Sequence, residues 1–237
     1  PGENAMPAVL DAKALREIPL FTGLTDAQLE RVNQLAHRKI FPAGAAVITM
    51  ETPGEVVYAI LKGTVKIKID QVDGTEVIIA MLGPGEVVGE LSVLDSYGRS
   101  ADVLTLEDTT LMWLDRSGFE SLLREIPAIK DNMLRLLSRR VRLSTEQIQA
   151  LCTLDVYGKV ARQLLVFADQ YGVTTPEGRT IPMRLTQSDV AGMVGASRER
   201  VNQVFVSLRG RKLLAVDKDY RVTLPDPEKL RELLRQR

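Results

Sequence analysis

GELSVLDSYGRS, residues 89–100, places a carboxylate and a guanidinium nine residues apart across a short turn, with a hydroxyl directly after the guanidinium. The Glu90 carboxylate can accept a hydrogen bond from a sugar hydroxyl, and the Arg99 guanidinium can donate two hydrogen bonds to one phosphate group. Ser100 can donate to the same phosphate. The stretch therefore predicts a site for a ribose phosphate, although a surface loop with an ordinary Glu–Arg ion pair would contain the same residues.

Backbone groups extend this candidate site. Gly89 allows a ligand to approach the main chain closely. Residues 91–94 predict one short helical turn, whose first N–H groups would point at an anion. We therefore include Leu91 and Ser92 among the candidate ligand contacts.

A helical segment and a β region surround the stretch. Residues 11–37 carry apolar positions at helical spacing, with Thr25 as a suitable N-cap. His37, the only histidine, has no second histidine or cysteine nearby, so we expect it to have a packing or surface role rather than to bind a metal. From Phe41 to Leu114 the pattern is that of short strands separated by glycines.

Two hairpins are predicted in the β region. Val65–Ile69 alternates apolar and charged residues, Asp73-Gly74 is a hairpin turn signal, and Val77–Ile79 forms the return strand. Residues 103–105 and 111–114 form the second candidate hairpin. Many short antiparallel strands at this spacing predict a small barrel or roll.

Two helices are predicted after the β region. Ser117 and Glu120 form a capping box that would start the first, through Leu123. The second runs from about Lys130 to Cys152 and has a seam at alternating spacings of three and four residues, which is typical of two helices packing against each other. The seam residues are Leu134, Leu137, Val141, Ser144, Ile148 and Leu151. We therefore predict a dimer helix, in which Ser144 with Thr145 is either a tolerated or register-setting polar position or a contact to a ligand.

Composition limits the class of protein. A chain of 237 residues with 45% hydrophobic and 26% charged residues is typical of a globular protein of one or two domains. The lone Cys152 excludes an intrachain disulfide framework and a four-cysteine metal site within one chain. No apolar run approaches the roughly 20 residues that span a bilayer. We expect a cytoplasmic protein with no membrane partner.

The net charge of zero conceals an asymmetry along the chain. Residues 1–155 hold 16 basic and 22 acidic side chains, net −6, whereas residues 156–237 hold 15 basic and 9 acidic side chains, net +6. A basic C-terminal third indicates an anionic partner, most simply nucleic acid.

The basic third contains the pattern of a helix-turn-helix. Residues 185–195 predict a helix that ends at glycine, and a second helix, with an apolar face, begins at Ser197. Its outward side chains stand where recognition helices address base edges, although a helical hairpin with a solvated charged face would show the same pattern. Residues 213–216 and 220–224 look like a β-hairpin wing. The candidate DNA contacts are Thr186, Gln187, Ser188, Ser197, Arg198, Glu199, Arg200, Asn202 and Gln203.

With these motifs the chain resembles the CRP/FNR superfamily of bacterial regulators, and within it the cyclic-AMP receptor proteins, over nearly its whole length. Gly89-Glu90-Leu91 followed by Arg99-Ser100 matches the phosphate-binding cassette of that family. Arg140 stands where the family has a helix arginine near the cassette glutamate. Ser144-Thr145 falls at its adenine-contacting hydroxyl pair, and Ser197-Arg198-Glu199 matches the start of its recognition helix.

The resemblance implies an α+β fold with an N-terminal cyclic-nucleotide-binding β-roll, a long dimerisation helix and a C-terminal winged helix-turn-helix. The expected domains are residues 1–129, residues 130–154, which include the hinge, and residues 155–237, with Asp155 capping the helix after the hinge. We expect a homodimeric transcription regulator, not an enzyme, that binds palindromic double-stranded DNA under the control of cyclic AMP and needs no metal. RNA polymerase would be contacted through Thr174, Thr175 and Glu177.

The same resemblance implies roles for the candidate site residues. Glu90 would hold the ribose, and Arg99 with Ser100 the cyclic phosphate. Ser144 and Thr145, one of them from the partner chain, would hold the base. A ligand between the β-roll and the dimer seam would bias the register of the helices, and so couple nucleotide binding and DNA binding reciprocally.

The chain departs from the family pattern at two places. Gln203 stands where the cyclic-AMP receptors usually carry a third base-reading arginine, so we expect an altered or relaxed DNA half-site. The hydroxyl pair is Ser-Thr where the family often has Thr-Ser. The clustered N-terminal cysteines of the FNR branch are not in the sequence.

Two rival interpretations remain. A regulator of the same fold could be effector-independent or sense another small molecule, which a titration with cyclic AMP would reveal. An enzyme could use Glu90 and Arg99 in phosphodiester chemistry, but the sequence has no evident metal set and no general base paired with a nucleophile.

Overall fold

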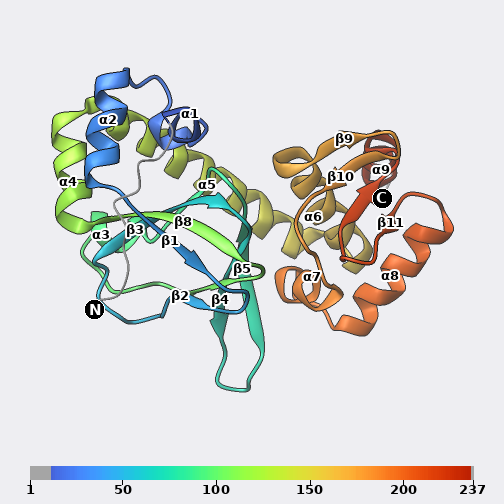
Figure 1. The fold of residues 1–237 in the computed structure, drawn as a ribbon. Helices are drawn as coiled ribbons and strands as arrows, with labels where there is room; N and C mark the ends of the chain where they lie inside the picture. Colours follow the sequence, from blue (N-terminus) through green and yellow to red (C-terminus); the bar gives the residue numbers. More distant parts are fainter. Residues whose placement is uncertain (1–11, 236–237) are drawn as a thin grey trace. The chain divides into compact units, whose positions relative to one another are not determined.

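The computed structural model describes residues 12–235, which form two compact units (Figure 1). The first unit comprises the described chain up to Ile69 and Ile79–Arg142, and the second comprises Asp70–Ile78 and the chain from Leu143 onward. The division falls inside the long helix α5, Pro127–Thr153. The predicted α+β fold with a β-roll, a long helix and a winged helix-turn-helix is confirmed. The domain boundaries near residues 129 and 154 stay predictions.

Two four-stranded sheets form the β-roll of the first unit. Their strand orders are β1-β8-β3-β6 and β2-β7-β4-β5. The neighbouring positions of β4 and β5 agree with the predicted hairpin at Asp73-Gly74. The strands are β1 (His37–Phe41), β2 (Ala46–Ile48), β3 (Val56–Lys62), β4 (Val65–Asp70), β5 (Glu76–Leu82), β6 (Val87–Val88), β7 (Asp102–Thr105) and β8 (Thr109–Asp115).

The second predicted hairpin, between residues 103–105 and 111–114, is wrong. β7 pairs with β2 and β4, whereas β8 pairs with β1 and β3 in the other sheet. The chain crosses between the sheets after β7, where the Leu106 N–H donates to the Thr64 carbonyl at 2.9 Å. The alternation of apolar residues finds strands, but it does not say which strands pair.

Helices cover the sheet that contains β1, β8 and β3 (Figure 1). Leu29 of α2 and Phe119 of α4 pack into one core cluster with Val57 and Leu114 of that sheet. Thr25 caps α2 in a capping box with Gln28, as the sequence predicts for its N-cap. The helices are α1 (Ala12–Arg16), the 3-10 helix η1 (Pro19–Phe21), α2 (Asp26–Leu35) and α4 (Arg116–Glu125).

His37 has the packing role expected for it. It lies at the start of β1, and its ring stacks on Trp113 of β8 with centroids 4.3 Å apart. Among residues 12–235, no group of three or more metal-ligating side chains could hold a metal ion.

The predicted capping box of Ser117 and Glu120 is wrong, because α4 begins earlier. Asp115 is the N-cap, and its carboxylate accepts from the Gly118 N–H at 2.6 Å and from the Ser117 hydroxyl at 3.0 Å. Asp115 ends β8 with the extended backbone that an N-cap needs, and its carboxylate is a stronger acceptor than a hydroxyl. Arg116 thus becomes the first residue of α4.

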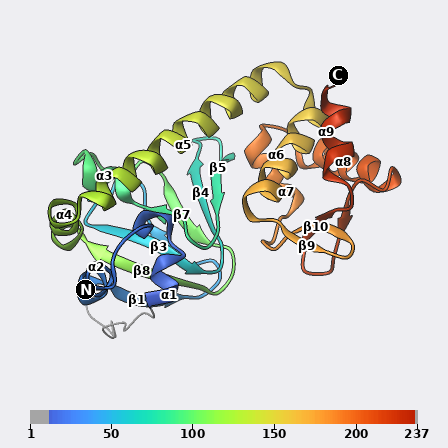
Figure 2. The same ribbon diagram turned by 90° about the horizontal axis from the view of Figure 1, so that it is seen from above.

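The second unit is built around α6 (Val156–Tyr171), which packs against α7 (Gln187–Val194), α8 (Arg198–Gly210) and α9 (Pro227–Arg235) (Figure 2). Asp155 caps α6, as predicted, by accepting from the Gly158 N–H at 2.7 Å. Within the described range, no helix is both long enough and apolar enough to cross a membrane.

One four-stranded sheet completes the second unit, with the strand order β11-β12-β10-β9. The antiparallel pair β11 (Ala215–Val216) and β12 (Val222–Leu224) confirms the predicted wing. β9 (Val173–Thr175) and β10 (Gly178–Ile181) form a second hairpin. Thr174 and Thr175 therefore lie in β9.

Candidate functional site

Residues 89–100, the cassette, begin with the predicted short helix, α3 (Glu90–Leu94). Gly89 caps α3 with a left-handed backbone at φ 81°. A Cβ atom at Gly89 would lie 2.6 Å from Nη1 of Arg99 and 2.9 Å from the carbonyl oxygen of Val56. Glycine is therefore required both for the backbone conformation and for the close approach of Arg99.

Glu90 is a buried carboxylate with a matched arginine. Its side chain is turned inward, and the residue is 2% exposed. Arg140 of α5 donates from Nη1 to Oε1 of Glu90 at 2.5 Å, and from Nη2 to the carbonyl of Val87. Arg140 also pairs with Glu86 at 3.5 Å. A buried carboxylate is costly unless it is paired, so the bond from Arg140 to Oε1 offsets the burial of Glu90 and leaves Oε2 for another donor.

Arg99 is buried as well, at 7% exposure. Its Nη1 donates to the Gly89 carbonyl at 2.8 Å and to the Ser92 hydroxyl at 3.4 Å, and its Nη2 donates to the Val56 carbonyl at 2.8 Å. Burial lowers the pKa of Arg99, an effect that Tyr58 and the nearby carboxylates oppose. These bonds use three of the five guanidinium N–H donors and leave the Nε–H and one N–H of Nη2 for another acceptor. The neighbouring Ser100 is exposed.

The structure thus brings part of the predicted ligand set together. Gly89, Glu90, Ser92, Arg99 and Arg140 form one polar cluster. Leu91, at 45% exposure, faces outward from α3. Ser144 and Thr145 are exposed on the part of α5 that belongs to the second unit, and their roles stay predictions.

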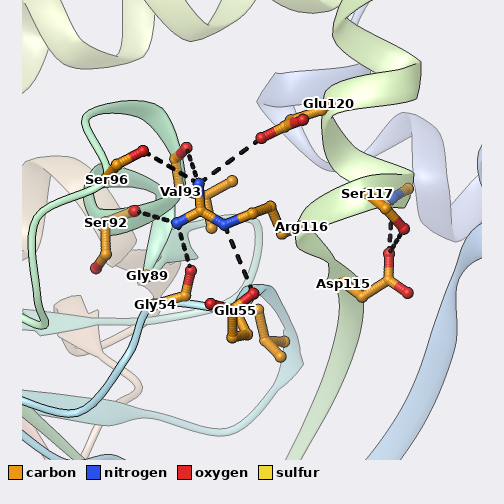
Figure 3. Close-up of polar contacts among 12 residues, drawn as sticks. Gly54, Glu55, Gly89, Ser92, Val93, Ser96, Asp115, Arg116, Ser117 and Glu120 are labelled. Carbon is orange, nitrogen blue, oxygen red and sulfur yellow. Dashed lines mark hydrogen bonds and ion pairs between the residues drawn. The ribbon is translucent and has the colours of Figure 1, made fainter.

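Sequence reasoning missed one arginine beside the cassette. Arg116 donates to the carbonyls of Gly54, Ser92 and Val93 at 3.0, 2.8 and 3.2 Å, as Figure 3 shows. The local sequence carries no signal for this role, because the acceptors are backbone carbonyls that every residue has.

Capping residues fix the two helices of the helix-turn-helix. Thr186 caps α7 in a capping box with Asp189, a partner that the sequence analysis did not single out. α7 ends at Gly195, whose φ of 61° is the left-handed C-cap predicted by its glycine. Ser197 caps α8 and accepts from the Arg200 N–H at 3.3 Å. The predicted pair of helices and its glycine turn are confirmed.

α8 has one buried face and one exposed face. The buried residues are Val201, Val204, Phe205 and Leu208, as predicted. The exposed candidate contacts on α8 are Arg198, Glu199, Arg200, Asn202 and Gln203. Gln187 of α7 donates from Nε2 to Oδ1 of Asn202 at 3.0 Å, which ties the start of α7 to the outer face of α8. Ser188 is exposed on α7. The amide groups of Gln187 and Asn202 therefore lie on one surface.

Comparisons with known proteins match both units. The cyclic nucleotide-binding domain matches residues 38–125, and the Crp-like helix-turn-helix domain matches residues 158–233. The chain is 31% identical over 208 residues to the CRP-like cAMP-activated global transcriptional regulator of Mycobacterium tuberculosis, covering 84% of this chain and 93% of that protein. It is 30% identical to the cyclic AMP receptor protein of Thermus thermophilus, over 80% of this chain and 85% of that one.

A solved structure is also similar. The c-di-GMP-responsive global regulator CLP of Xanthomonas campestris superposes with a TM-score of 0.70 and 25% identity, covering 84% of this chain and 99% of that chain.

Proposed function

The chain belongs to the CRP family of DNA-binding transcription regulators and carries its cyclic-nucleotide-binding domain, and from that premise we propose that it is a homodimer whose binding to palindromic DNA is controlled by cyclic AMP. The family consists of transcription regulators rather than enzymes. We place its action in the cytoplasm, where the DNA is.

The polar cluster of the cassette is the observation that carries this proposal. Arg140 donates to Oε1 of Glu90, and Oε2 would accept from a ribose hydroxyl. Arg99 keeps its Nε–H for a phosphate oxygen, and Ser100 stands next to it with an exposed hydroxyl. The site thus offers a carboxylate for the sugar, and next to it a cation and a hydroxyl for the phosphate. This combination suits a cyclic nucleotide better than it suits a free sugar or a free phosphate.

The base would be held by α5. Ser144 and Thr145 are exposed there, and their hydroxyls can each donate one hydrogen bond and accept others from an adenine edge. In a dimer, one of the two would reach the nucleotide in the same chain and the other the nucleotide of the partner. This arrangement would make the ligand part of the dimer seam and so bias the placement of both recognition helices.

An exposed apolar row on α5 supports the dimer. Leu134, Val141 and Ile148 follow one another at intervals of seven residues and are 64%, 66% and 62% exposed. Side chains of this size on one helix stripe are expected to pack against a second helix. Leu151 continues the stripe at 38% exposure.

Replacing Val141 and Ile148 together with Asp is expected to convert the dimer into a folded monomer. Paired carboxylates in a packed seam would be buried without partners, whereas both positions are exposed within the single chain. Sedimentation velocity gives the mass, and circular dichroism checks the fold. Gln149→Asp, an exposed neighbour outside the stripe, is the control and should remain dimeric. A double variant that also stays dimeric would place the seam elsewhere.

The outer face of α8 would read DNA, with one α8 from each protomer in successive major grooves. RNA polymerase would be contacted at the β9–β10 hairpin, through Thr174, Thr175 and Glu177. Glu177 lies in the turn of that hairpin.

Selection from a random-sequence DNA pool tests effector, dimer and half-site together. With cyclic AMP the wild-type protein should enrich two-fold symmetric sites, and without it the enrichment should fall. Equal enrichment with and without nucleotide would remove cyclic AMP from the proposal.

A second effector is favoured by one similarity. Because the solved regulator CLP responds to c-di-GMP, the selection should include c-di-GMP and cyclic GMP in parallel arms. Enrichment that depends on c-di-GMP alone would reassign the effector while keeping the DNA-binding function. Enrichment that no nucleotide alters would indicate an effector-independent regulator.

A further inference from the structure

The cassette helix is held by two arginines, of which only one is in the cassette. Arg99 donates to the Gly89 carbonyl ahead of α3 and to the Ser92 hydroxyl. Arg116 donates to the carbonyls of Ser92 and Val93 near the end of α3. Ser92 thus bonds both guanidiniums, one through its side chain and one through its main chain.

The carbonyls that Arg116 binds need a donor from outside the helix. The last four carbonyls of any helix lack partners within it, and α3 has only five residues. A cation at this end also suits the direction of the helix dipole. Arg116 therefore satisfies acceptors that α3 cannot satisfy by itself.

Arg116 also fixes the surface against which α3 packs. Its Nη2 donates to the Gly54 carbonyl at 3.0 Å, and a Cβ atom at Gly54 would lie 2.1 Å from Cβ of Ser92. The helix and the segment before β3 thus touch at Gly54, and one guanidinium bonds both sides of that contact. Nη1 reaches the Ser96 hydroxyl at 3.3 Å on the loop that follows α3 (Figure 3).

Two carboxylates border the Arg116 guanidinium without replacing these bonds. Glu55 lies 3.6 Å from Nε and Glu120 lies 3.7 Å from Nη1. Both glutamates are substantially exposed, and exposed pairs contribute little. The carbonyl bonds, rather than the ion pairs, are expected to determine where α3 lies.

We propose that Arg116 is a positioning residue for the nucleotide pocket: it holds α3, and with it Gly89 and Glu90, in the binding position without touching the ligand. This inference rests on the proposed function for its ligand. Because Arg116 is the first residue of α4, it also links the cassette directly to that helix.

Arg116→Met is the principal test, with cyclic AMP titrated against the full-length protein by calorimetry. Apparent affinity falls in proportion to the fraction of protein in the competent state, so a helix α3 that is correctly placed about one tenth of the time would weaken binding about tenfold. Hydrogen exchange of the α3 amides should accelerate in the variant without nucleotide and slow again when saturating cyclic AMP is added.

Two further variants isolate the cause. Arg31→Met removes a surface arginine of the same unit, which pairs with Glu125 at 2.8 Å, and should leave both affinity and α3 exchange unchanged. The double variant Glu55→Gln and Glu120→Gln keeps the carbonyl bonds and should bind cyclic AMP within about twofold of wild type.

The outcomes separate this inference from the proposed function. If the wild-type protein binds cyclic AMP, and Arg116→Met binds it with the same affinity and shows the same hydrogen exchange in α3, the role of Arg116 is overturned. The proposed function is then unaffected. Wild type that binds no cyclic nucleotide overturns the proposed effector and this inference with it. If Arg116→Met does not fold, Arg116→Lys, which keeps the charge but loses the fork, takes its place with the same expected direction.

Discussion

Arg99→Lys is expected to weaken the binding of cyclic AMP by roughly 10- to 150-fold, which corresponds to about 1.5–3 kcal/mol for a hydrogen bond to a charged group. Lysine keeps the positive charge but lacks the planar fork of arginine. It cannot both hold the Gly89 and Val56 carbonyls, as Arg99 does, and donate to a phosphate. Calorimetric titration of the full-length protein measures the change.

The choice of lysine follows from the burial of Arg99. From the sequence we expect Arg99→Ala to abolish the nucleotide response and to leave the fold intact, but the burial of Arg99, at 7% exposure, argues against the second part of that expectation. Alanine would leave the Gly89 and Val56 carbonyls without their donor, at a cost of about 1–3 kcal/mol for each one left buried. A loss of binding in Arg99→Ala would therefore mix misfolding with a lost contact.

A matched control uses another arginine of the first unit. Arg31 donates two hydrogen bonds to the carboxylate of Glu125 on the surface, at 2.8 and 3.1 Å. Arg31→Lys therefore removes a two-donor arginine contact at a place outside the cassette. It should bind cyclic AMP as wild type does. If Arg99→Lys binds equally well while its thermal unfolding is unchanged, Arg99 does not hold the phosphate.

Helix ends could be predicted from the sequence where the donor and the acceptor of the capping hydrogen bond lie close together along the chain. Thr25, Asp155 and Ser197 were each predicted as helix starts, and each accepts a hydrogen bond from the backbone N–H three residues further on. The glycine that ends α7 was predictable because few other residues adopt a left-handed C-cap. The helix-turn-helix was for this reason visible in the sequence.

Long-range partners were not predictable in the same way. The sequence shows that Arg99 follows a short helical turn, but not that its donors meet the carbonyl of Val56, 43 residues away. The hairpin between β7 and β8 failed for a related reason, because strand pairing is decided by packing in three dimensions. Arg116 was missed because its acceptors are backbone carbonyls, which every residue has.

The pairing of Glu90 with Arg140 is an intermediate case. Fifty residues separate them, and nothing in the local sequence of either indicates the other. The family resemblance placed Arg140 near the cassette glutamate, and the structure brings the two side chains together. The family resemblance thus predicted a contact between Glu90 and Arg140 that periodicity and capping rules could not predict.

The recognition helix gives the other large expected effect. Arg198→Ala should relax selection for one G·C pair, because arginine can donate two hydrogen bonds to O6 and N7 of guanine, worth roughly 1–3 kcal/mol of discrimination. Glu199 can accept from the N4 amino group of a cytosine with a similar preference. Both side chains are exposed in the structure, so their replacement should not disturb the fold. Selection from a random DNA pool measures the change in base preference.

Arg200→Ala should behave differently from Arg198→Ala. We expect Arg200 to contact phosphate, so its loss should weaken binding to all sequences alike and lower the slope of log affinity against log salt by about one unit. Binding is measured at several salt concentrations on a selected duplex and on an unrelated duplex. These measurements distinguish a phosphate contact from a base contact. A change in base preference in Arg200→Ala would contradict the assignment.

Gln203 decides whether the half-site differs from that expected for an arginine at this position. Glutamine can pair with N6 and N7 of adenine, whereas arginine prefers guanine, so Gln203→Arg should change the selected base at one position and leave the pairs read by Arg198 and Glu199 in place. Ser207→Arg adds the same charge one turn further along α8 and should raise general affinity without altering that base. Identical half-sites from wild type and Gln203→Arg would mean that Gln203, although exposed on the outer face of α8, does not read a base.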